Sequence, residues 1–231
     1  MCAIPILQNM NYAFVNGEIV EAEKASVSIF DRGLILGDGL FETVKAVEGI
    51  PEFFSDHWNR LSVSSKKLFI SIKYDEAFFR SLIAELCEKS ELKEAAVRIT
   101  ITRGISAGLS IDPTIEPTII VTALPITWLN KTLYSEGVSV AITSVKRSSA
   151  SGIDGHIKTT NYLANIMAKH EADKKGAYEG IFLSEKGEIA EMTTSSFFCV
   201  AHDALYTPPL DVDILPGITR QQVIKAAKNL E

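Results

Sequence analysis

The dipeptide Asn16-Gly17 separates two short strand-like runs, 12–15 and 18–21, near the start of the chain. Both residue types tolerate the positive φ angles that a two-residue hairpin turn requires, so the chain is predicted to open with an antiparallel hairpin. Further strand-like runs follow in both halves, and each half has only a few helical segments. This pattern favours a mixed α+β fold over a regular winding of parallel strands and helices.

The first half is predicted to combine three more strands with two helices, which begin at about Asp56 and near Asp75. The three strand-like runs are 40–47, 96–102 and 118–124. In the run 96–102, apolar residues alternate with Arg98 and threonines, so the two sets point to opposite faces of the strand. The face that carries Arg98 is a candidate polar wall.

The segment 126–131 interrupts this pattern and is predicted to link two domains, 1–125 and 132–231. The second domain is predicted to contain a helix from about 160 to 175 and a final helix that begins near Gly217. Its strand-like runs are 138–145, 180–183, 197–200 and 205–207.

Charge and cysteine content exclude several classes of function. The 23 Lys and Arg residues against 29 Asp and Glu give a net charge of -6, the wrong sign for binding nucleic acid or an anionic membrane. The apolar runs are much shorter than the ~20 residues that cross a bilayer, and the N-terminus has no signal-peptide pattern. Cys2, Cys87 and Cys199 are isolated, which favours reduced thiols over disulfides or a metal site. We expect a cytoplasmic protein without a metal ion.

Two basic residues could take part in chemistry. Lys158 follows a loop of small residues and precedes a helix, a setting that suits a Schiff-base lysine, although a solvated surface lysine is the commoner case. Arg60 could bind a phosphate, or it could form an ion pair with Asp56 one turn earlier.

Two further features involve anions. The final helix starts with Pro216 and Gly217, and its backbone amides together with the Thr219 hydroxyl could bind an anion, or could simply begin the helix. Glu191 precedes a run of hydroxyl residues and could keep a heterocyclic nitrogen protonated, or could belong to an ordinary polar loop. Taken together, a lysine, an arginine, a helix start and a carboxylate are the contacts that pyridoxal 5'-phosphate requires.

Several motifs, in this order along the chain, resemble the class IV aminotransferase family. That family contains branched-chain aminotransferases, D-amino acid aminotransferases and 4-amino-4-deoxychorismate lyases. The motifs that carry the resemblance are Phe30–Gly33, Gly37–Thr43, His57–Leu61, Lys158–Leu163, Glu179–Leu183, Glu191 and Leu215–Arg220.

The resemblance implies a role for each matching residue. Lys158 would form the Schiff base and move the proton, Glu191 would face the pyridine nitrogen, and Tyr162 would lie near the ring hydroxyl of the cofactor. The phosphate would be bound by Arg60, Ile218, Thr219, and Thr194 or Ser195.

The resemblance also implies fold type IV, with a small N-terminal α/β domain, a larger C-terminal domain containing a barrel-like sheet, and pyridoxal phosphate between them. Members of the family act on small amino substrates and are usually homodimers. They continue beyond the helix that begins at Ile218, so the second domain is expected to be incomplete at its end.

Departures from the motifs bear on the substrate. The loop 105–110 lacks the arginine and histidine that bind the substrate carboxylate in D-amino acid aminotransferases. The spacing between Lys158 and Asn161 is one residue shorter than in branched-chain enzymes and matches the lyases, whereas Arg98 is shared with the branched-chain enzymes. Phe41 and Arg98 are the predicted substrate residues. The sequence favours a 4-amino-4-deoxychorismate lyase, which releases pyruvate and 4-aminobenzoate for folate synthesis, with a branched-chain or D-amino acid aminotransferase as the alternative.

Two other classes of function are compatible with parts of the sequence. A cofactor-free Schiff-base enzyme would use Lys158 but would leave Glu191 and the Thr219 helix start unexplained. The other class is a binding or structural protein that retains the fold without the chemistry.

Overall fold

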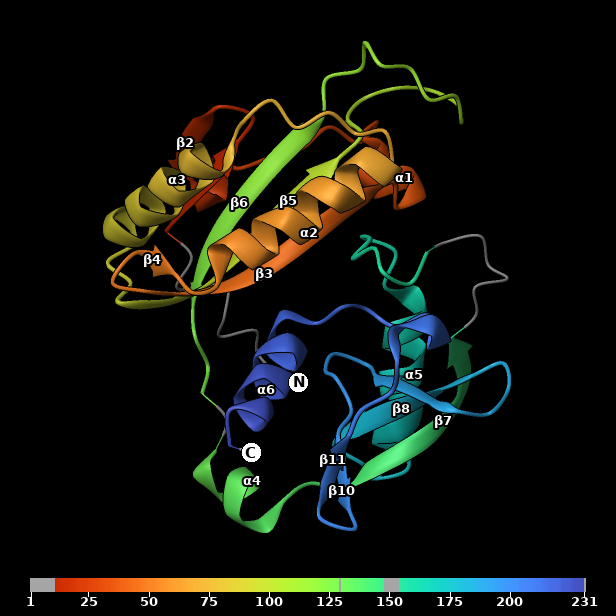
Figure 1. Ribbon diagram of the computed structural model, residues 1–231. Helices are drawn as coiled ribbons and strands as arrows, with labels where there is room; N and C mark the ends of the chain where they lie inside the picture. Colours follow the sequence, from red (N-terminus) through yellow and green to blue (C-terminus); the bar gives the residue numbers. More distant parts are fainter. Residues whose placement is uncertain (1–10, 129, 148–153, 231) are drawn as a thin grey trace. The chain divides into compact units, whose positions relative to one another are not determined.

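A computed structural model describes residues 11–128, 130–147 and 154–230 (Figure 1). The chain divides into two compact units. The first comprises Met1–Trp128 and Lys158–Asn161, and the second comprises Leu129–Ile157 and Tyr162–Glu231. The division after Trp128 falls within the predicted linker, but Lys158–Asn161 belongs to the first unit although the sequence predicts it within the second.

The first unit contains a six-stranded antiparallel sheet with the strand order β2-β1-β6-β5-β3-β4. Its strands are β1 (Tyr12–Val15), β2 (Glu18–Glu21), β3 (Gly39–Val47), β4 (Ile50–Pro51), β5 (Glu94–Thr102) and β6 (Thr118–Pro125). The predicted hairpin is confirmed, because β1 pairs with β2 around Asn16 and Gly17, whose φ angles are 51° and 114°.

Two long helices, α2 (Phe54–Lys67) and α3 (Glu76–Lys89), cover one face of this sheet (Figure 1). Asp75 caps α3 by accepting a hydrogen bond from the Phe78 amide at 2.8 Å, as the sequence predicts for this residue type. The apolar face of β5 forms the centre of the core: Val97, Ile99 and Ile101 are fully buried. The predicted two-sided strand is therefore confirmed.

Two short helical segments of the first unit have no counterpart in the sequence prediction. They are α1 (Arg32–Leu36) and the 3-10 helix η2 (Ala22–Lys24). The side chain of Asp31 caps α1, and Gly37 ends it in the left-handed conformation at φ 67°. A helix of only five residues is too short to show a hydrophobic period, which is why the pattern did not reveal it.

The segment Lys158–Asn161 runs along the edge of β3. The Phe41 amide donates to the Lys158 carbonyl, and the Thr160 amide donates to the Gly39 carbonyl, both at 2.9 Å. A side chain at Gly39 would place its Cβ only 2.8 Å from the Ile101 carbonyl oxygen of β5 and 3.2 Å from the Thr160 hydroxyl, so the packing of β3 between β5 and this segment favours glycine. Because Thr160 pairs with a strand, the helix predicted from about 160 begins only at Leu163.

The second unit contains a three-stranded sheet in the order β7-β8-β9 and a separate two-stranded sheet, β10-β11. Strands β7 and β8 are parallel, and α5, which connects them along the chain, packs on both. The elements are α4 (Lys131–Glu136), β7 (Val140–Arg147), α5 (Leu163–Lys174), β8 (Glu179–Ser184), β9 (Ile189–Met192), β10 (Cys199–Ala201), β11 (Ala204–Tyr206), η4 (Leu210–Val212) and α6 (Ile218–Lys228). The α+β class predicted from the sequence is confirmed.

Among the residues that the structure describes, no helix combines the length and the apolar character needed to cross a membrane.

Candidate active site

Lys158 lies on the strand-edge segment of the first unit, beside an aromatic ring. Its Nζ is 4.4 Å from the centroid of the Phe41 ring. Because the Lys158 carbonyl accepts the Phe41 amide, the same residue of β3 holds the lysine backbone and contacts its side chain. The Lys158 side chain is half-buried and therefore constrained in its direction.

Arg98 contacts the same ring. The guanidinium carbon of Arg98 is 3.6 Å from the Phe41 centroid, a cation–π distance, and its Nε donates to the Thr100 hydroxyl at 3.1 Å. In the pairing of β3 with β5, Phe41 lies opposite Thr100 and Thr43 lies opposite Arg98, which places these side chains on one face of the sheet. The structure thus brings together the three residues that the sequence assigns to the Schiff base and the substrate: Lys158, Phe41 and Arg98.

Arg60 projects from α2 toward a buried carboxylate on β3. Its Nε and Nη2 donate to the two oxygens of Glu42 at 2.6 and 2.7 Å, and Nδ1 of His57 lies 2.8 Å from the same carboxylate. Burial alone would raise the pKa of Glu42, but the hydrogen bonds and positive charges of Arg60 and His57 outweigh burial and lower this pKa below its ordinary value. The sequence motifs contain Glu42 and His57 but assigned no role to either residue.

Glu191 lies on β9 of the second unit and is buried. Its carboxylate forms an ion pair with Nη2 of Arg147 at 2.8 Å and accepts a hydrogen bond from the Leu215 amide at 3.2 Å. These two contacts hold the Glu191 side chain in place, and a carboxylate is the group expected beside a protonated ring nitrogen. The sequence did not indicate Arg147 as a partner, because it is far from Glu191 along the chain.

The hydroxyl run after β9 is held by a second buried glutamate. Glu179 accepts the hydroxyl of Thr194 at 2.8 Å, the hydroxyl of Ser195 at 2.7 Å and the amide of Thr194 at 2.6 Å. A hydroxyl has one proton, so in this arrangement both side chains donate to Glu179 and offer their lone pairs elsewhere. Glu179 belongs to a motif of the sequence, but the motif did not reveal this function.

The remaining predicted cofactor residues lie at helix starts in the second unit. Gly217 is the N-cap of α6 and makes no side-chain cap, Ile218 is buried and Thr219 is exposed. No side chain at the N-cap accepts hydrogen bonds from the first backbone amides of this 11-residue helix. Such amides at a helix N-terminus can bind an anion. Tyr162 is the N-cap residue of α5.

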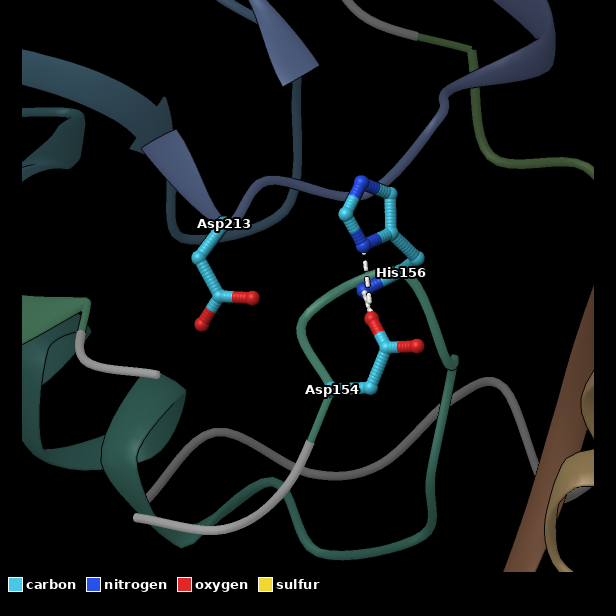
Figure 2. A group of neighbouring side chains, drawn as sticks. All are labelled: Asp154, His156 and Asp213. Atoms are coloured by element: carbon cyan, nitrogen blue, oxygen red, sulfur yellow. Dashed lines mark hydrogen bonds and ion pairs between the residues drawn. The ribbon is translucent and has the colours of Figure 1, made fainter. Parts of the chain in front are cut away.

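A histidine and two aspartates gather just before the lysine segment, within the second unit (Figure 2). Nδ1 of His156 lies 2.6 Å from Asp154, and Asp213 accepts the Gly155 amide at 2.9 Å. Their potential ligand atoms lie within 4.8 Å of one another, and all three side chains are half-buried. These hydrogen bonds secure the chain two residues before Lys158.

Comparisons with known proteins assign the chain to a family. Residues 39–231 match the model of the family described as Amino-transferase class IV. The chain is 36% identical over 216 residues to a Methanocaldococcus jannaschii protein named "Putative branched-chain-amino-acid aminotransferase", a match that covers 93% of this chain and 74% of the relative. It is 33% identical over 220 residues to the aminodeoxychorismate lyase of Bacillus subtilis, covering 94% of this chain and 74% of the relative.

A solved structure with a similar fold is the branched-chain amino acid aminotransferase of Escherichia coli. The TM-score is 0.88 at 28% sequence identity, and the match covers 96% of this chain and 75% of that one. The fold predicted from the motifs is therefore confirmed.

Proposed function

Because the chain belongs to the class IV aminotransferase family, whose members are pyridoxal-phosphate enzymes, we propose that it transfers the amino group of a small amino acid. The observation that carries this proposal is the group formed by Lys158, Phe41 and Arg98. A lysine amine can form a Schiff base with the cofactor aldehyde and can then act as the base toward the amino substrate, and a guanidinium beside it matches a substrate carboxylate.

The residues present fit pyridoxal phosphate. The helix start at Thr219 and the guanidinium of Arg60 suit a phosphate, the Glu191 carboxylate beside Arg147 suits a protonated pyridine nitrogen, and Tyr162 is our candidate for the ring hydroxyl. When bound, the cofactor supplies an aldehyde that captures amines and a ring that withdraws electrons.

The side chains of this chain would then handle orientation and proton transfer. Lys158 takes the proton from the α-carbon of the substrate at its Nζ and returns it one step later, which requires a neutral amine at that moment. The Phe41 ring limits the positions of this amine, and Arg98 orients the carboxylate of the substrate. Glu179 receives the hydroxyl protons of Thr194 and Ser195 and also the amide proton of Thr194. Of these two residues, Ser195 would therefore be the phosphate ligand, and it would contribute through its backbone amide.

A second candidate reaction is the elimination of pyruvate from 4-amino-4-deoxychorismate, which the sequence favours. The short spacing from Lys158 to Asn161 and the 33% identity to a lyase support it. We place transamination first because the matches at 36% identity and at a TM-score of 0.88 both carry aminotransferase names. Both reactions begin with the same proton transfer by Lys158.

A spectroscopic and product assay tests these proposals. We expect the protein mixed with pyridoxal phosphate to gain a visible absorbance band that borohydride traps on Lys158, and Lys158→Ala to lose turnover while still binding the cofactor noncovalently. A branched-chain or D-amino acid should then convert the cofactor to its amine form. Formation of 4-aminobenzoate from aminodeoxychorismate, without that conversion, would replace transamination by the lyase reaction. A protein that stays colourless would refute both.

We also propose a cytoplasmic homodimer. Large apolar side chains are exposed on and beside α1, the sort of surface that a second copy could cover: Ile29, Phe30, Leu34 and Ile35. The free thiols of Cys87 and Cys199 suit a reducing compartment. Light scattering should give a mass of two chains, and a single-chain mass at micromolar concentration would contradict the dimer.

A further inference from the structure

Glu42 is among the most deeply buried charged residues that the structure describes. It contacts Arg60, the predicted phosphate ligand. It is 1% exposed on β3, on the face covered by α2, with Leu40 and Val44 as its neighbours on that face. A buried carboxylate at an apolar helix–sheet interface costs stability unless it is paired and hydrogen-bonded. We therefore looked for a function of Glu42 other than packing.

The geometry of its pair with Arg60 restricts the direction of the guanidinium. Glu42 binds the edge formed by Nε and Nη2 with two nearly equal distances, 2.6 and 2.7 Å. Such a two-point contact aligns the planar group with the carboxylate and turns the Nη1 end away from Glu42. Nδ1 of His57, one turn before Arg60 on α2, adds a third contact to the same carboxylate at 2.8 Å.

Resting on the proposed function, we propose that Glu42 is a positioning residue of the phosphate site: it holds Arg60 so that the opposite end of the guanidinium is presented to the cofactor phosphate. Arginine has a long flexible side chain, and fixing it in advance reduces the conformational entropy lost when phosphate binds. Glu42 itself touches no cofactor atom in this arrangement, and its effect on affinity passes through Arg60.

Titrations with two ligands that differ only in the phosphate test this role. Dissociation constants are measured by absorbance for pyridoxal 5'-phosphate and for pyridoxal, with the wild type, Glu42→Gln, Arg60→Met and the double variant. Glu52→Gln is the control, since Glu52 forms an exposed pair with Lys45. Melting temperatures confirm that each variant is folded under the conditions of the titration.

We expect Glu42→Gln to raise the dissociation constant for pyridoxal phosphate about tenfold, which is the scale of one charge-assisted contact. The dissociation constant for pyridoxal should change by no more than about twofold. In the Arg60→Met background, Glu42→Gln should have no further effect. If the role of Glu42 were merely structural, Glu42→Gln would weaken the binding of both ligands alike. Its effect would then also add to the effect of Arg60→Met in the double variant. If Glu42→Gln does not fold, Glu42→Asp keeps the charge but retracts it, and the same criteria apply.

The result that overturns the proposal is an unchanged phosphate preference in Glu42→Gln, or an equal loss for both ligands. A wild type that binds pyridoxal phosphate no better than pyridoxal would refute the proposed cofactor site itself. The two failures are therefore distinguishable.

Discussion

Replacing Asp38 by asparagine should destabilise the first unit more than any exposed substitution. Asp38 lies between Gly37 and Gly39 and joins two buried arginines. Nη2 of Arg32 lies 2.7 Å from its carboxylate, and Nε and Nη2 of Arg103 donate to it at 2.7 and 3.0 Å. The side chains of the two arginines are only 5% and 7% exposed. Removing the carboxylate charge leaves two buried cations without a counter-charge.

The expected cost follows from these contacts. Breaking a buried ion pair typically costs roughly 3–5 kcal/mol. Arg103 keeps hydrogen bonds to the carbonyls of Leu68 and Phe69, and Arg32 keeps one to the carbonyl of Ser110, so we expect the lower limit, about 3 kcal/mol. With a urea slope of about 2 kcal/mol per molar, this corresponds to a midpoint lowered by about 1.5 M.

Tryptophan fluorescence during urea unfolding measures this shift for the first unit alone, because both tryptophans, Trp58 and Trp128, belong to it. The matched control is Glu52→Gln, whose exposed pair with Lys45 should contribute about 0–1 kcal/mol. If Asp38→Asn lowers the midpoint no more than the control does, the buried charges do not depend on Asp38 and the reasoning fails.

Three other predictions concern single groups. Gly39→Ala should shift β3 against β5 and move the adjoining Thr160, and so lower kcat at least tenfold, because a Cβ there would lie 2.8 Å from the Ile101 carbonyl oxygen of β5; unchanged kcat would contradict this reasoning. Hydrogen bonds from Lys175 and from β7 lower the pKa of Glu171 to about 2, from an ordinary value of 4.5, so its contribution to stability is present above pH 4.5 and is lost as the pH falls toward 2. Melting temperatures should therefore fall less steeply over that range in Glu171→Gln than in the wild type, and parallel curves would refute the linkage. Burial raises the pKa of the Cys87 thiol, so a thiol reagent should label the exposed Cys199 in the folded protein and Cys87 only after unfolding; mass spectrometry of the labelled peptides decides this.

Only part of the candidate site could be predicted from the sequence. The motifs identified Lys158, Glu191 and Arg60 by residue type and order, because the chemistry of pyridoxal phosphate demands a particular set of groups. They did not show that Arg60 is held by Glu42 or that Glu191 is held by Arg147. Partners of this kind are set by the register of distant strands, which one sequence does not report.

Local backbone preferences are the part of the fold that the sequence by itself determined. Asn16-Gly17 makes a turn wherever two strands flank it, Asp75 caps a helix, and the alternation around Ile99 creates one buried face, because each depends on residues a few positions apart. The return of Lys158 to the edge of β3 was decided only by the tertiary structure, since Thr160 lies within a stretch that reads as helix. Strand pairing across more than a hundred residues outweighs that weak local preference, and it places the lysine amine beside Phe41.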